Sequence, residues 1–263
     1  MKARDSVRRV GLARVMSKLG YCSRSRAAEL IRAGRVSLNG EVRRDPETPV
    51  GGDGQIEIDG EIIAARQKLY YMLNKPRGVV TTASDEKGRE TVYSLLGREF
   101  ADLANASTEP LNWIAPVGRL DRASEGLLLL TNDSEWAAGI TAPESHLDKV
   151  YHVQVGVVAD DVLLHRLTRG VKAKDGERLR VKRVNRLRAG EKNSWLEIVL
   201  DEGKNRHIRR MMEATGIDVL RLLRVAIGPL QLGDLAKGRY RALTADEKPL
   251  LDRALLKCNS KKK

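Results

Sequence analysis

The sequence predicts an α+β fold in two domains: a small N-terminal domain made of a helix pair and a short sheet, then a larger domain built on a mostly antiparallel mixed sheet. The chain has 263 residues, 41% of them hydrophobic, which is enough for two cores. Residues 1–44 hold twelve Lys and Arg against three acidic residues, so this segment carries +9 of the net charge of +13. Beyond residue 69, strand and helix patterns follow one another without a regular βαβ rhythm.

Two helices are expected near the start of the chain. Apolar residues follow the spacing of one helical face from Leu12 to Leu19, and Gly20 can end that helix. Ser23 fits the N-cap of a second helix, which Gly34 ends. A disordered basic tail is the alternative interpretation of this segment, and the helix signals favour a folded unit.

A short sheet is expected after the helix pair. Residues 35–38 alternate like a strand that ends in the turn Asn39-Gly40. Residues 55–58 and 61–63, joined by Asp59-Gly60, have the pattern of a tight hairpin. We therefore place the first domain at residues 8–63 and a linker without apolar pattern at residues 64–68.

The larger domain, residues 69–257, is expected to mix short strands with short helices, and residues 258–263 form a basic tail. The expected strands are 69–73, 79–82, 113–117, 127–131, 149–155, 179–184, 195–200 and 219–224. The expected helices are 91–96, 135–140, 160–167, 206–215 and 245–256.

The composition excludes several classes of protein. No apolar run approaches the roughly 18 residues that cross a bilayer, and the N-terminus lacks the apolar stretch of a secretory signal. Two cysteines, Cys22 and Cys258, are too few for a disulfide framework or a zinc cage. The sequence therefore predicts a cytoplasmic protein that binds no membrane and no metal. Its basic charge predicts a polyanionic partner, nucleic acid first.

Three polar segments of the larger domain are candidates for chemistry. Residues 74–78, Asn-Lys-Pro-Arg-Gly, form a basic break after a strand, although an ordinary turn has the same pattern. In residues 118–126, Asp121 lies between two arginines just before an apolar strand. A carboxylate among cations stays ionised, which suits a nucleophile or an electrostatic group better than a general acid. A structural ion-pair network is the alternative for Asp121.

The third segment, residues 202–212, opens a helix whose first turn carries several cations. Positive charge there opposes the helix dipole, so an anion is expected in front of this helix, either a phosphate or an acidic side chain.

In combination these segments resemble one family. The four motifs are Asn-Lys-Pro-Arg-Gly at 74–78, Gly-Arg-Leu-Asp at 118–121 with Glu-Gly-Leu-Leu-Leu-Leu-Thr-Asn-Asp at 125–133, Lys-Val-Tyr at 149–151, and Glu-Gly-Lys-Asn-Arg-His-Ile-Arg-Arg-Met at 202–211. In this order the chain resembles the RsuA/RluB/RluE/RluF family of ribosomal RNA pseudouridine synthases. Residues 23–40 resemble the alpha-L RNA-binding module of a ribosomal protein and of some RNA-modifying enzymes.

The resemblance implies an enzyme that isomerises a uridine of ribosomal RNA to pseudouridine without a cofactor, with large-subunit RNA favoured over small-subunit RNA. It implies that Asp121 is the catalytic carboxylate, that Tyr151 stacks on the uracil, and that Arg209 pairs with Asp121 and holds its rotamer. Whether the carboxylate attacks covalently or acts in another way stays open.

Further site residues follow from the same resemblance. Ile208 is expected to line the uracil pocket, and Lys75 and Arg119 are expected to contact the substrate. His207 stands where the family most often has Gln, so its role is open.

The expected partner is ribosomal RNA or a ribosome assembly intermediate, bound by a monomer. The expected phosphate contacts are basic residues of the N-terminal segment and of the third motif: Arg8, Arg9, Lys18, Arg24, Arg26, Arg32, Arg35 and Arg206. A non-catalytic assembly factor and a nuclease are the rival hypotheses. A nuclease would need metal-binding carboxylates or paired histidines, and the sequence shows neither pattern.

Overall fold

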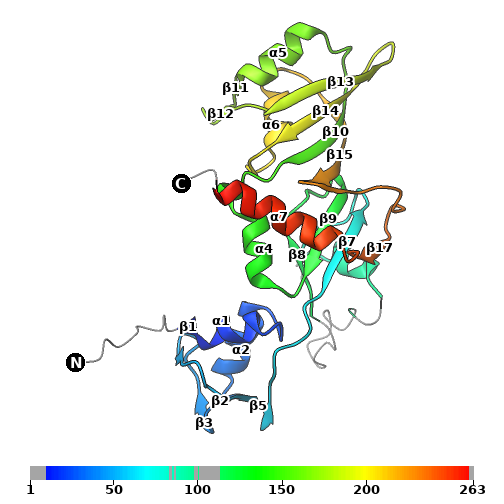
Figure 1. Cartoon of the computed structure of the whole chain (residues 1–263). Helices are drawn as coiled ribbons and strands as arrows, with labels where there is room; N and C mark the ends of the chain where they lie inside the picture. Colours follow the sequence, from blue (N-terminus) through cyan, green and yellow to red (C-terminus); the bar gives the residue numbers. More distant parts are fainter. Residues whose placement is uncertain (1–9, 83–84, 86, 98–99, 101–112, 261–263) are drawn as a thin grey trace, which may run out of the picture. The chain divides into compact units, whose positions relative to one another are not determined.

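The computed structural model describes residues 10–82, 85, 87–97, 100 and 113–260, which fold into two compact units (Figure 1). The first unit comprises the chain up to Leu69, the described part of Gly97–Ala115, and Thr131–Trp136. The second comprises Tyr70–Leu96, Pro116–Leu130 and the chain from Ala137 onward. The mixture of helices and sheets confirms the predicted α+β class. None of the described helices combines the length and apolar character needed to cross a membrane.

The first unit contains the two predicted helices, α1 (Leu12–Lys18) and α2 (Arg24–Arg32), packed on a four-stranded antiparallel sheet of order β3-β2-β5-β6. The Ser23 hydroxyl accepts a hydrogen bond from the Arg26 backbone N–H at 3.1 Å, so Ser23 caps α2 as predicted. A further two-stranded pair, β1 with β4, was not predicted. The strands are β1 (Val10–Gly11), β2 (Val36–Leu38), β3 (Glu41–Arg43), β4 (Pro49–Val50), β5 (Ile56–Ile58) and β6 (Glu61–Ile62).

The two turns expected in this unit are present. Asn39 and Gly40 have φ of 54° and 79°, and Asp59 and Gly60 have φ of 51° and 86°. Two consecutive positive φ values are what a two-residue hairpin turn requires, and Asn, Asp and Gly tolerate them best.

The second unit is built on a nine-stranded sheet with the main order β13-β14-β10-β15-β9-β7-β17. β9 runs parallel to β15, whereas β10 is antiparallel to both of its neighbours, so the sheet is mostly antiparallel as predicted. Its strands are β7 (Tyr70–Lys75), β8 (Ala115–Val117), β9 (Glu125–Thr131), β10 (Lys149–Val155), β13 (Arg183–Ala189), β14 (Ser194–Leu200), β15 (Val219–Ile227), β16 (Leu230–Gln231) and β17 (Tyr240–Ala242). A separate hairpin pairs β11 (Val171–Lys172) with β12 (Arg178–Leu179).

Several predicted elements of this unit have different bounds. The strand expected at residues 79–82 is only an isolated bridge between Val80 and Thr91, because this segment is used to hold a loop rather than to extend the sheet. The strand expected at residues 179–184 is divided between β12 and β13. β16 and β17 were missed. The helices are η1 (Val92–Leu95), α4 (Ser134–Thr141), η3 (Pro143–Ser145), α5 (Asp161–Arg169), α6 (His207–Glu213) and α7 (Glu247–Ser260).

Helices α5 and α6 cover one face of the strands β13, β14, β10 and β15, which we call the inner face (Figure 1). Val153 lies opposite Leu196 on β14 and Leu222 on β15, and all three are buried against the two helices. The next residue of β10, Gln154, points to the opposite side, the outer face, because successive side chains of a strand alternate.

Gly126 fixes the join between β9 and β15. Its φ is +102°, and a Cβ at this position would lie 2.3 Å from the Arg224 carbonyl oxygen. We expect Gly126→Ala to lower the free energy of unfolding by about 3 kcal/mol, from backbone strain together with the forced separation of two strands. Urea unfolding measures this loss. Gly216→Ala is the matched control, since φ there is +75° but nothing lies within 4 Å of the added Cβ. An equal loss in both variants would show that only the backbone conformation matters.

Candidate active site

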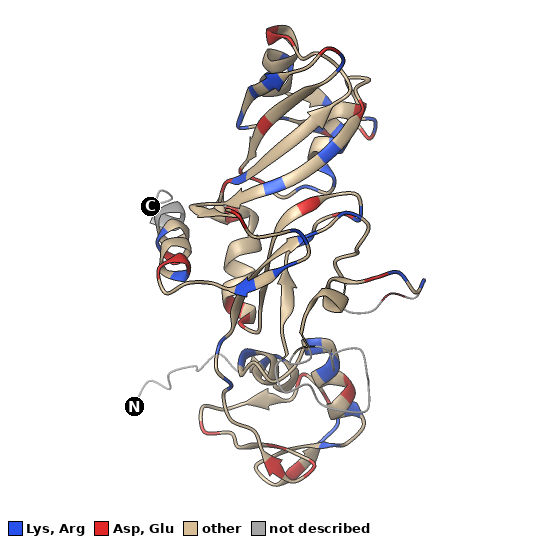
Figure 2. Ribbon diagram, turned by 90° about the vertical axis from the view of Figure 1, so that its right-hand side faces the viewer, with Lys and Arg blue, Asp and Glu red and all other residues tan. Residues whose placement is uncertain are grey.

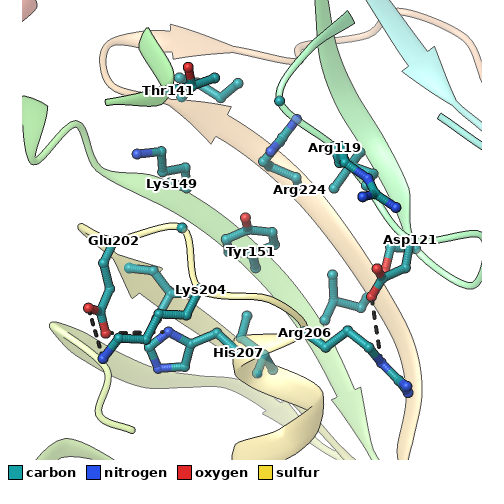
Figure 3. Close-up of a pocket in the computed structure, with 18 of the residues that line it drawn as sticks. Arg119, Asp121, Thr141, Lys149, Tyr151, Glu202, Lys204, Arg206, His207 and Arg224 are labelled. Atoms are coloured by element: carbon teal, nitrogen blue, oxygen red, sulfur yellow. Dashed lines mark ion pairs between the residues drawn. The ribbon is translucent and has the colours of Figure 1, made fainter. Parts of the chain in front are cut away.

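A cavity of about 200 Å³ opens on the inner face of the second unit's sheet (Figure 3). Its walls come from segments far apart in the sequence: the loop before β9, strands β10 and β15, the end of α4, and the loop that leads into α6. Of the residues expected from the sequence, it is lined by Arg119, Asp121, Tyr151, Arg206, Ile208 and Arg209.

The loop that carries Asp121 is held by its backbone carbonyls. The Leu120 carbonyl accepts from the Thr81 hydroxyl at 2.8 Å, and the Arg122 carbonyl accepts from the Gly78 N–H at 2.8 Å. The Ala123 carbonyl accepts from Arg209 at 3.0 Å. The donors come from the segment that follows β7 and from α6, so the Asp121 backbone is fixed independently of its side chain.

Lys75 adds further hydrogen bonds to the backbone of this loop. Its side chain is fully buried, and its ammonium donates to the carbonyls of Pro76, Asp121 and Ser124 at 3.0, 3.2 and 2.9 Å. Lys75 is not among the residues that line the cavity. We expected Lys75 to contact the substrate. In the structure its three N–H donors are all directed at backbone carbonyls, so it holds the backbone of the Asp121 loop instead.

Burial lowers the pKa of Lys75 from its usual 10.5 to about 8, although Asp121 and Glu125 oppose the shift. Between pH 8 and 10.5 the unfolded chain therefore holds a proton on Lys75 that the folded chain does not hold. The free energy of unfolding contributed by this group rises with pH in that window, by about 3 kcal/mol, and is constant below it. Between pH 7.5 and pH 10 we expect wild type to gain about 2.4 kcal/mol relative to Lys75→Met. Urea unfolding at both pH values measures it, and an identical pH response of the two proteins would contradict the shift.

The Asp121 side chain is 39% exposed and faces the cavity. The nearest guanidinium is that of Arg206, whose Nε lies 4.0 Å from Asp121 Oδ2 (Figure 3). Arg209 was expected to pair with Asp121, but its hydrogen bond goes to the Ala123 carbonyl two residues further on. Burial lowers the pKa of the Arg209 guanidinium and Asp121 opposes that shift, so the two groups still interact electrostatically. The Arg209 Nε is buried without a hydrogen-bond partner.

Tyr151 and Ile208 form the apolar part of the cavity. Tyr151 lies opposite Ile198 of β14 and Arg224 of β15, next to a bulge that shifts the register after Val150. Bulges often re-aim a side chain beside an active site. Ile208 is buried in the first turn of α6. A tyrosine ring and an isoleucine side chain suit the flat, apolar faces of a nucleobase.

Cations outnumber acids around the cavity. Lys149, Arg224 and Lys204 line it in addition to the expected arginines, against the carboxylates of Asp121 and Glu202 (Figure 3). The sequence analysis missed Arg224, which is buried, donates from Nε to the Leu127 carbonyl at 2.7 Å and leaves Nη2 without a partner. An arginine at an inward position of a strand whose neighbouring inward residue, Leu222, is apolar was the signal that could have identified it.

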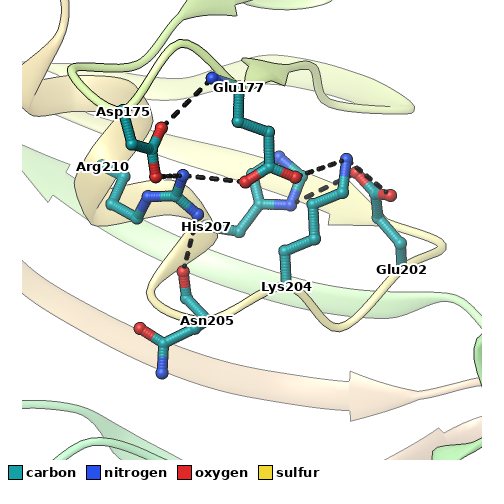
Figure 4. A network of polar contacts seen from close by, with 7 residues as sticks. All are labelled: Asp175, Glu177, Glu202, Lys204, Asn205, His207 and Arg210. Carbon is teal, nitrogen blue, oxygen red and sulfur yellow. Dashed lines mark hydrogen bonds and ion pairs between the residues drawn. The ribbon is translucent and has the colours of Figure 1, made fainter.

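Acidic side chains neutralise the cations in front of α6, one of the two anions that the sequence led us to expect (Figure 4). Glu177, from the β11–β12 hairpin, binds Arg210 at 2.8 Å and Lys204 at 3.3 Å, and Asp175 also pairs with Arg210. Glu202 binds Lys204 at 3.1 Å. These ion pairs hold the loop that carries Arg206, whose φ of 47° lies in the left-handed region.

His207 lies inside this network. Its side chain is buried, its ring lies next to the Arg180 backbone, and Nδ1 is 3.5 Å from Glu202 Oε1. Burial lowers the pKa of His207 while Glu202 opposes the shift, so the imidazole is neutral at pH 7.

The expected RNA contacts of the first unit differ in how free they are. Arg24 and Arg32 are exposed and form no ion pair with a described residue. Arg26 pairs with Glu29, Arg35 with Asp59, and Lys18 with Glu135. Exposed pairs of this kind are weak and can exchange for phosphate. Arg8 and Arg9 lie outside the described residues.

In the part of the chain that the structure describes, no group of three or more His, Cys, Asp or Glu is arranged to hold a metal ion.

Two family models match the chain. Residues 69–214 match the model described as RNA pseudouridylate synthase, and residues 10–56 match the S4 domain. "Ribosomal large subunit pseudouridine synthase B" of Bacillus subtilis is 36% identical over 237 residues, covering 90% of this chain and 93% of its own. An uncharacterized RNA pseudouridine synthase of Aquifex aeolicus is 36% identical over 252 residues, covering 94% and 95%. A crystal structure of a pseudouridylate synthase matches with a TM-score of 0.62 and 27% identity, covering 92% of this chain and 99% of that one.

Proposed function

The chain belongs to the RNA pseudouridylate synthase family, with an S4 domain before the synthase domain, and from that premise we propose that it converts a uridine of large-subunit ribosomal RNA to pseudouridine, with Asp121 as the essential carboxylate and without a cofactor. The observation that carries the proposal is the meeting of Asp121, Tyr151 and Arg209 at one cavity of about 200 Å³. That volume suits a single extruded nucleotide base rather than a paired strand.

The reaction is an isomerisation that needs no electron donor or acceptor. The bond between ribose C1′ and uracil N1 breaks, a bond between C1′ and C5 forms, the C5 proton leaves, and N1 gains a proton. A carboxylate can attack C1′, stabilise positive charge on the sugar, or remove a sugar proton.

The surrounding residues have separate tasks. Tyr151 stacks on the uracil while it is detached and turned, and Ile208 closes the apolar side of the pocket. Arg209 holds the Asp121 loop through the Ala123 carbonyl, and Arg206 sets the charge beside the carboxylate. Lys75 supports the same loop through the Asp121 and Ser124 carbonyls. Preorganised donors of this kind lower the barrier because they do not have to reorganise during the reaction.

The S4 domain supplies affinity for folded RNA. Extruding a stacked base costs a few kcal/mol, which phosphate contacts elsewhere on the RNA offset. Arg24 and Arg32 are the described residues of this domain that best suit such contacts, since both are exposed and neither has an acidic partner.

Pseudouridine mapping tests the function. The protein is incubated with unmodified 23S-type large-subunit RNA and with small-subunit RNA, and pseudouridine is mapped in each. A stem-loop that contains the uridine found in this way is then tested as a minimal substrate. We expect one or a few sites in the large-subunit RNA. No pseudouridine in any RNA would support an assembly factor, and strand cleavage that a chelator abolishes would support a nuclease.

Charge removal in the S4 domain should weaken binding without slowing chemistry. For Arg24→Ala with Arg32→Ala, we expect the log–log slope of affinity against salt to fall by roughly 1.4 to 1.8, at about 0.7 to 0.9 per lost phosphate contact. The single-turnover rate at saturating RNA should stay within twofold, because both residues lie in the first unit and none of the cavity residues does.

A salt titration of affinity, paired with single-turnover rates, measures both effects. Arg26→Ala is the comparison on the same helix, and it should lower the slope less than either arginine of the double variant, because Arg26 must first leave Glu29 to reach a phosphate. An unchanged slope in the double variant would show that this domain does not carry the RNA grip.

A further inference from the structure

The outer face of the second unit's sheet carries a row of side chains that the proposed reaction does not use. Opposite positions on the strands place Arg188 of β13 beside Trp195 of β14, Trp195 beside Gln154 of β10, and Gln154 beside Arg221 of β15. Figure 2 shows basic segments along the strands of this sheet. The cavity lies on the inner face, with Tyr151 and Leu222, so this row is a separate surface.

The indole of Trp195 is flanked by two guanidinium groups. The Cζ of Arg188 lies 5.3 Å from the ring centroid and that of Arg221 lies 5.6 Å from it. Both distances are within the range of a cation–π interaction. Trp195 itself is only partly buried, whereas its neighbour on β14, Leu196, is fully buried on the inner face. The ring is therefore held in place at a surface that solvent can reach.

A buried carboxylate, that of Glu125, holds the Arg221 guanidinium in place. Glu125, 2% exposed, accepts two hydrogen bonds from Arg221 at 3.2 Å and an ion pair from Lys237 at 2.6 Å. Burial raises the pKa of Glu125, but the hydrogen bonds and charges of Arg221 and Lys237 together outweigh burial and lower the pKa, so the carboxylate is ionised at neutral pH. This buried charge fixes one side of the indole.

The charges of this face leave an excess of cation. Its two carboxylates are both paired, Glu125 as described and Glu197 with Arg183 at 3.4 Å. Arg188 has no acidic partner among the described residues, and it is exposed. A polyanion therefore meets no unpaired carboxylate on these strands, although the exposed Glu191 lies nearby in the loop between β13 and β14.

We propose that this row, Arg188, Trp195, Gln154 and Arg221, binds a single-stranded segment of RNA. One nucleobase takes the place of the Arg188 guanidinium on the Trp195 indole, and the displaced Arg188 binds the flanking phosphate. An open sheet face with an aromatic ring and arginines is how several RNA-binding folds hold unpaired bases. Amide groups of Gln154 and Asn193, which bond each other at 3.3 Å, lie along the same row and can meet base edges. This proposal rests on the proposed function in one respect: an enzyme that modifies ribosomal RNA meets unpaired strands near its target uridine.

Tryptophan fluorescence tests the stacking directly. The chain has three tryptophans, so Trp113→Phe with Trp136→Phe leaves Trp195 as the single reporter. The probe is a nine-nucleotide oligoadenylate, which contains no uridine for the cavity. We expect saturable quenching of Trp195 emission, and much weaker quenching by a nine-base-pair duplex, whose bases are already stacked. If the single-tryptophan protein is unstable, the difference between wild type and Trp195→Phe in the same titration isolates the same signal.

A charge reversal locates the phosphate. Arg188→Glu keeps the indole and should raise the quenching midpoint about tenfold or more. Arg166→Glu is the matched control, because Arg166 is exposed on α5, which covers the inner face, and its change of charge is the same. We expect the control to shift the midpoint less than threefold. Trp195→Leu should weaken binding of labelled oligoadenylate by roughly 5- to 150-fold, the range for loss of one stacked base.

Two results would overturn the proposal: no change in Trp195 emission with oligoadenylate up to millimolar concentration, or equal midpoints for Arg188→Glu and Arg166→Glu. Isomerisation of a saturating stem-loop is measured on the same variants and should be unchanged. If the wild-type protein does not isomerise the stem-loop, the proposed function is wrong. If it isomerises the stem-loop but oligoadenylate does not quench Trp195, only the proposed RNA-binding row is wrong.

Discussion

Asp121→Asn is expected to lower the single-turnover rate by at least about 10³-fold, about 4 kcal/mol of barrier, while RNA binding stays within a few-fold. Asparagine keeps the shape of the side chain and removes the charge that every proposed role of this residue needs. The substitution should not disturb the loop, because the loop is held by backbone carbonyls from Leu120 to Ser124 and not by the carboxylate. Single-turnover assays on stem-loop RNA, with affinity measured by titration, separate the two effects.

Glu202→Gln is the matched control for this prediction. Glu202 lines the same cavity and the change also removes one carboxylate, but Glu202 pairs with Lys204 rather than standing at the Asp121 loop. We expect its rate to stay within about tenfold of wild type. A rate for Asp121→Asn at a tenth of wild type or more would remove Asp121 from the catalytic role, and an equal loss in both variants would point to the charge of the pocket as a whole.

The first unit could be predicted almost completely from the sequence. Its signals are local: an N-cap serine, a glycine after each helix, and two turns whose residues tolerate positive φ. The pair of β1 and β4 was missed because each strand has two residues and neither shows a period. Pairs of this length depend on tertiary packing rather than on sequence pattern.

Most strands of the larger sheet were predicted, but β16, β17 and the strand order were not. The parallel join of β9 to β15 links residues about a hundred positions apart, and only the positive φ of Gly126 at a close backbone approach marks it. Neither property has a periodic signal in the sequence. The segment at 79–82 has the composition of a strand, yet its Thr81 hydroxyl donates to the Leu120 carbonyl of the Asp121 loop, and its Val80 N–H donates to the Glu90 carbonyl.

The candidate site residues were proposed from motifs, and only the structure shows which contacts each of them makes. Lys75 stands in a basic segment of the sequence, where a phosphate ligand would be expected. Its side chain is completely buried, however, and it holds the backbone of the Asp121 loop instead. Arg224 lies in an apolar strand with no motif around it, and its place in the cavity depends on the register between β15 and β10. Long-range register of this kind cannot be predicted from one sequence.

Arg209→Ala is expected to lower the single-turnover rate by roughly 30- to 1,000-fold, about 2 to 4 kcal/mol, with little change in affinity for RNA. Its guanidinium is half-buried, holds the Ala123 carbonyl at 3.0 Å and interacts with Asp121. Removing it leaves that carbonyl without its donor and releases one end of the loop. Arg209→Lys should recover little, because a point charge lacks the planar pair of donors.

Two neighbouring arginines decide how this loss is interpreted. Arg206 is the guanidinium nearest to Asp121 at 4.0 Å, but its side chain is 60% exposed, so Arg206→Ala should cost less than tenfold in rate. Arg210 follows Arg209 on α6 and points to Asp175 and Glu177, so Arg210→Ala should leave the catalytic loop in place. If Arg209→Ala weakened binding at an unchanged single-turnover rate, Arg209 would be a phosphate contact. If Arg206→Ala lost more rate than Arg209→Ala, the direct ion pair, and not the hold on Ala123, would be what orients Asp121.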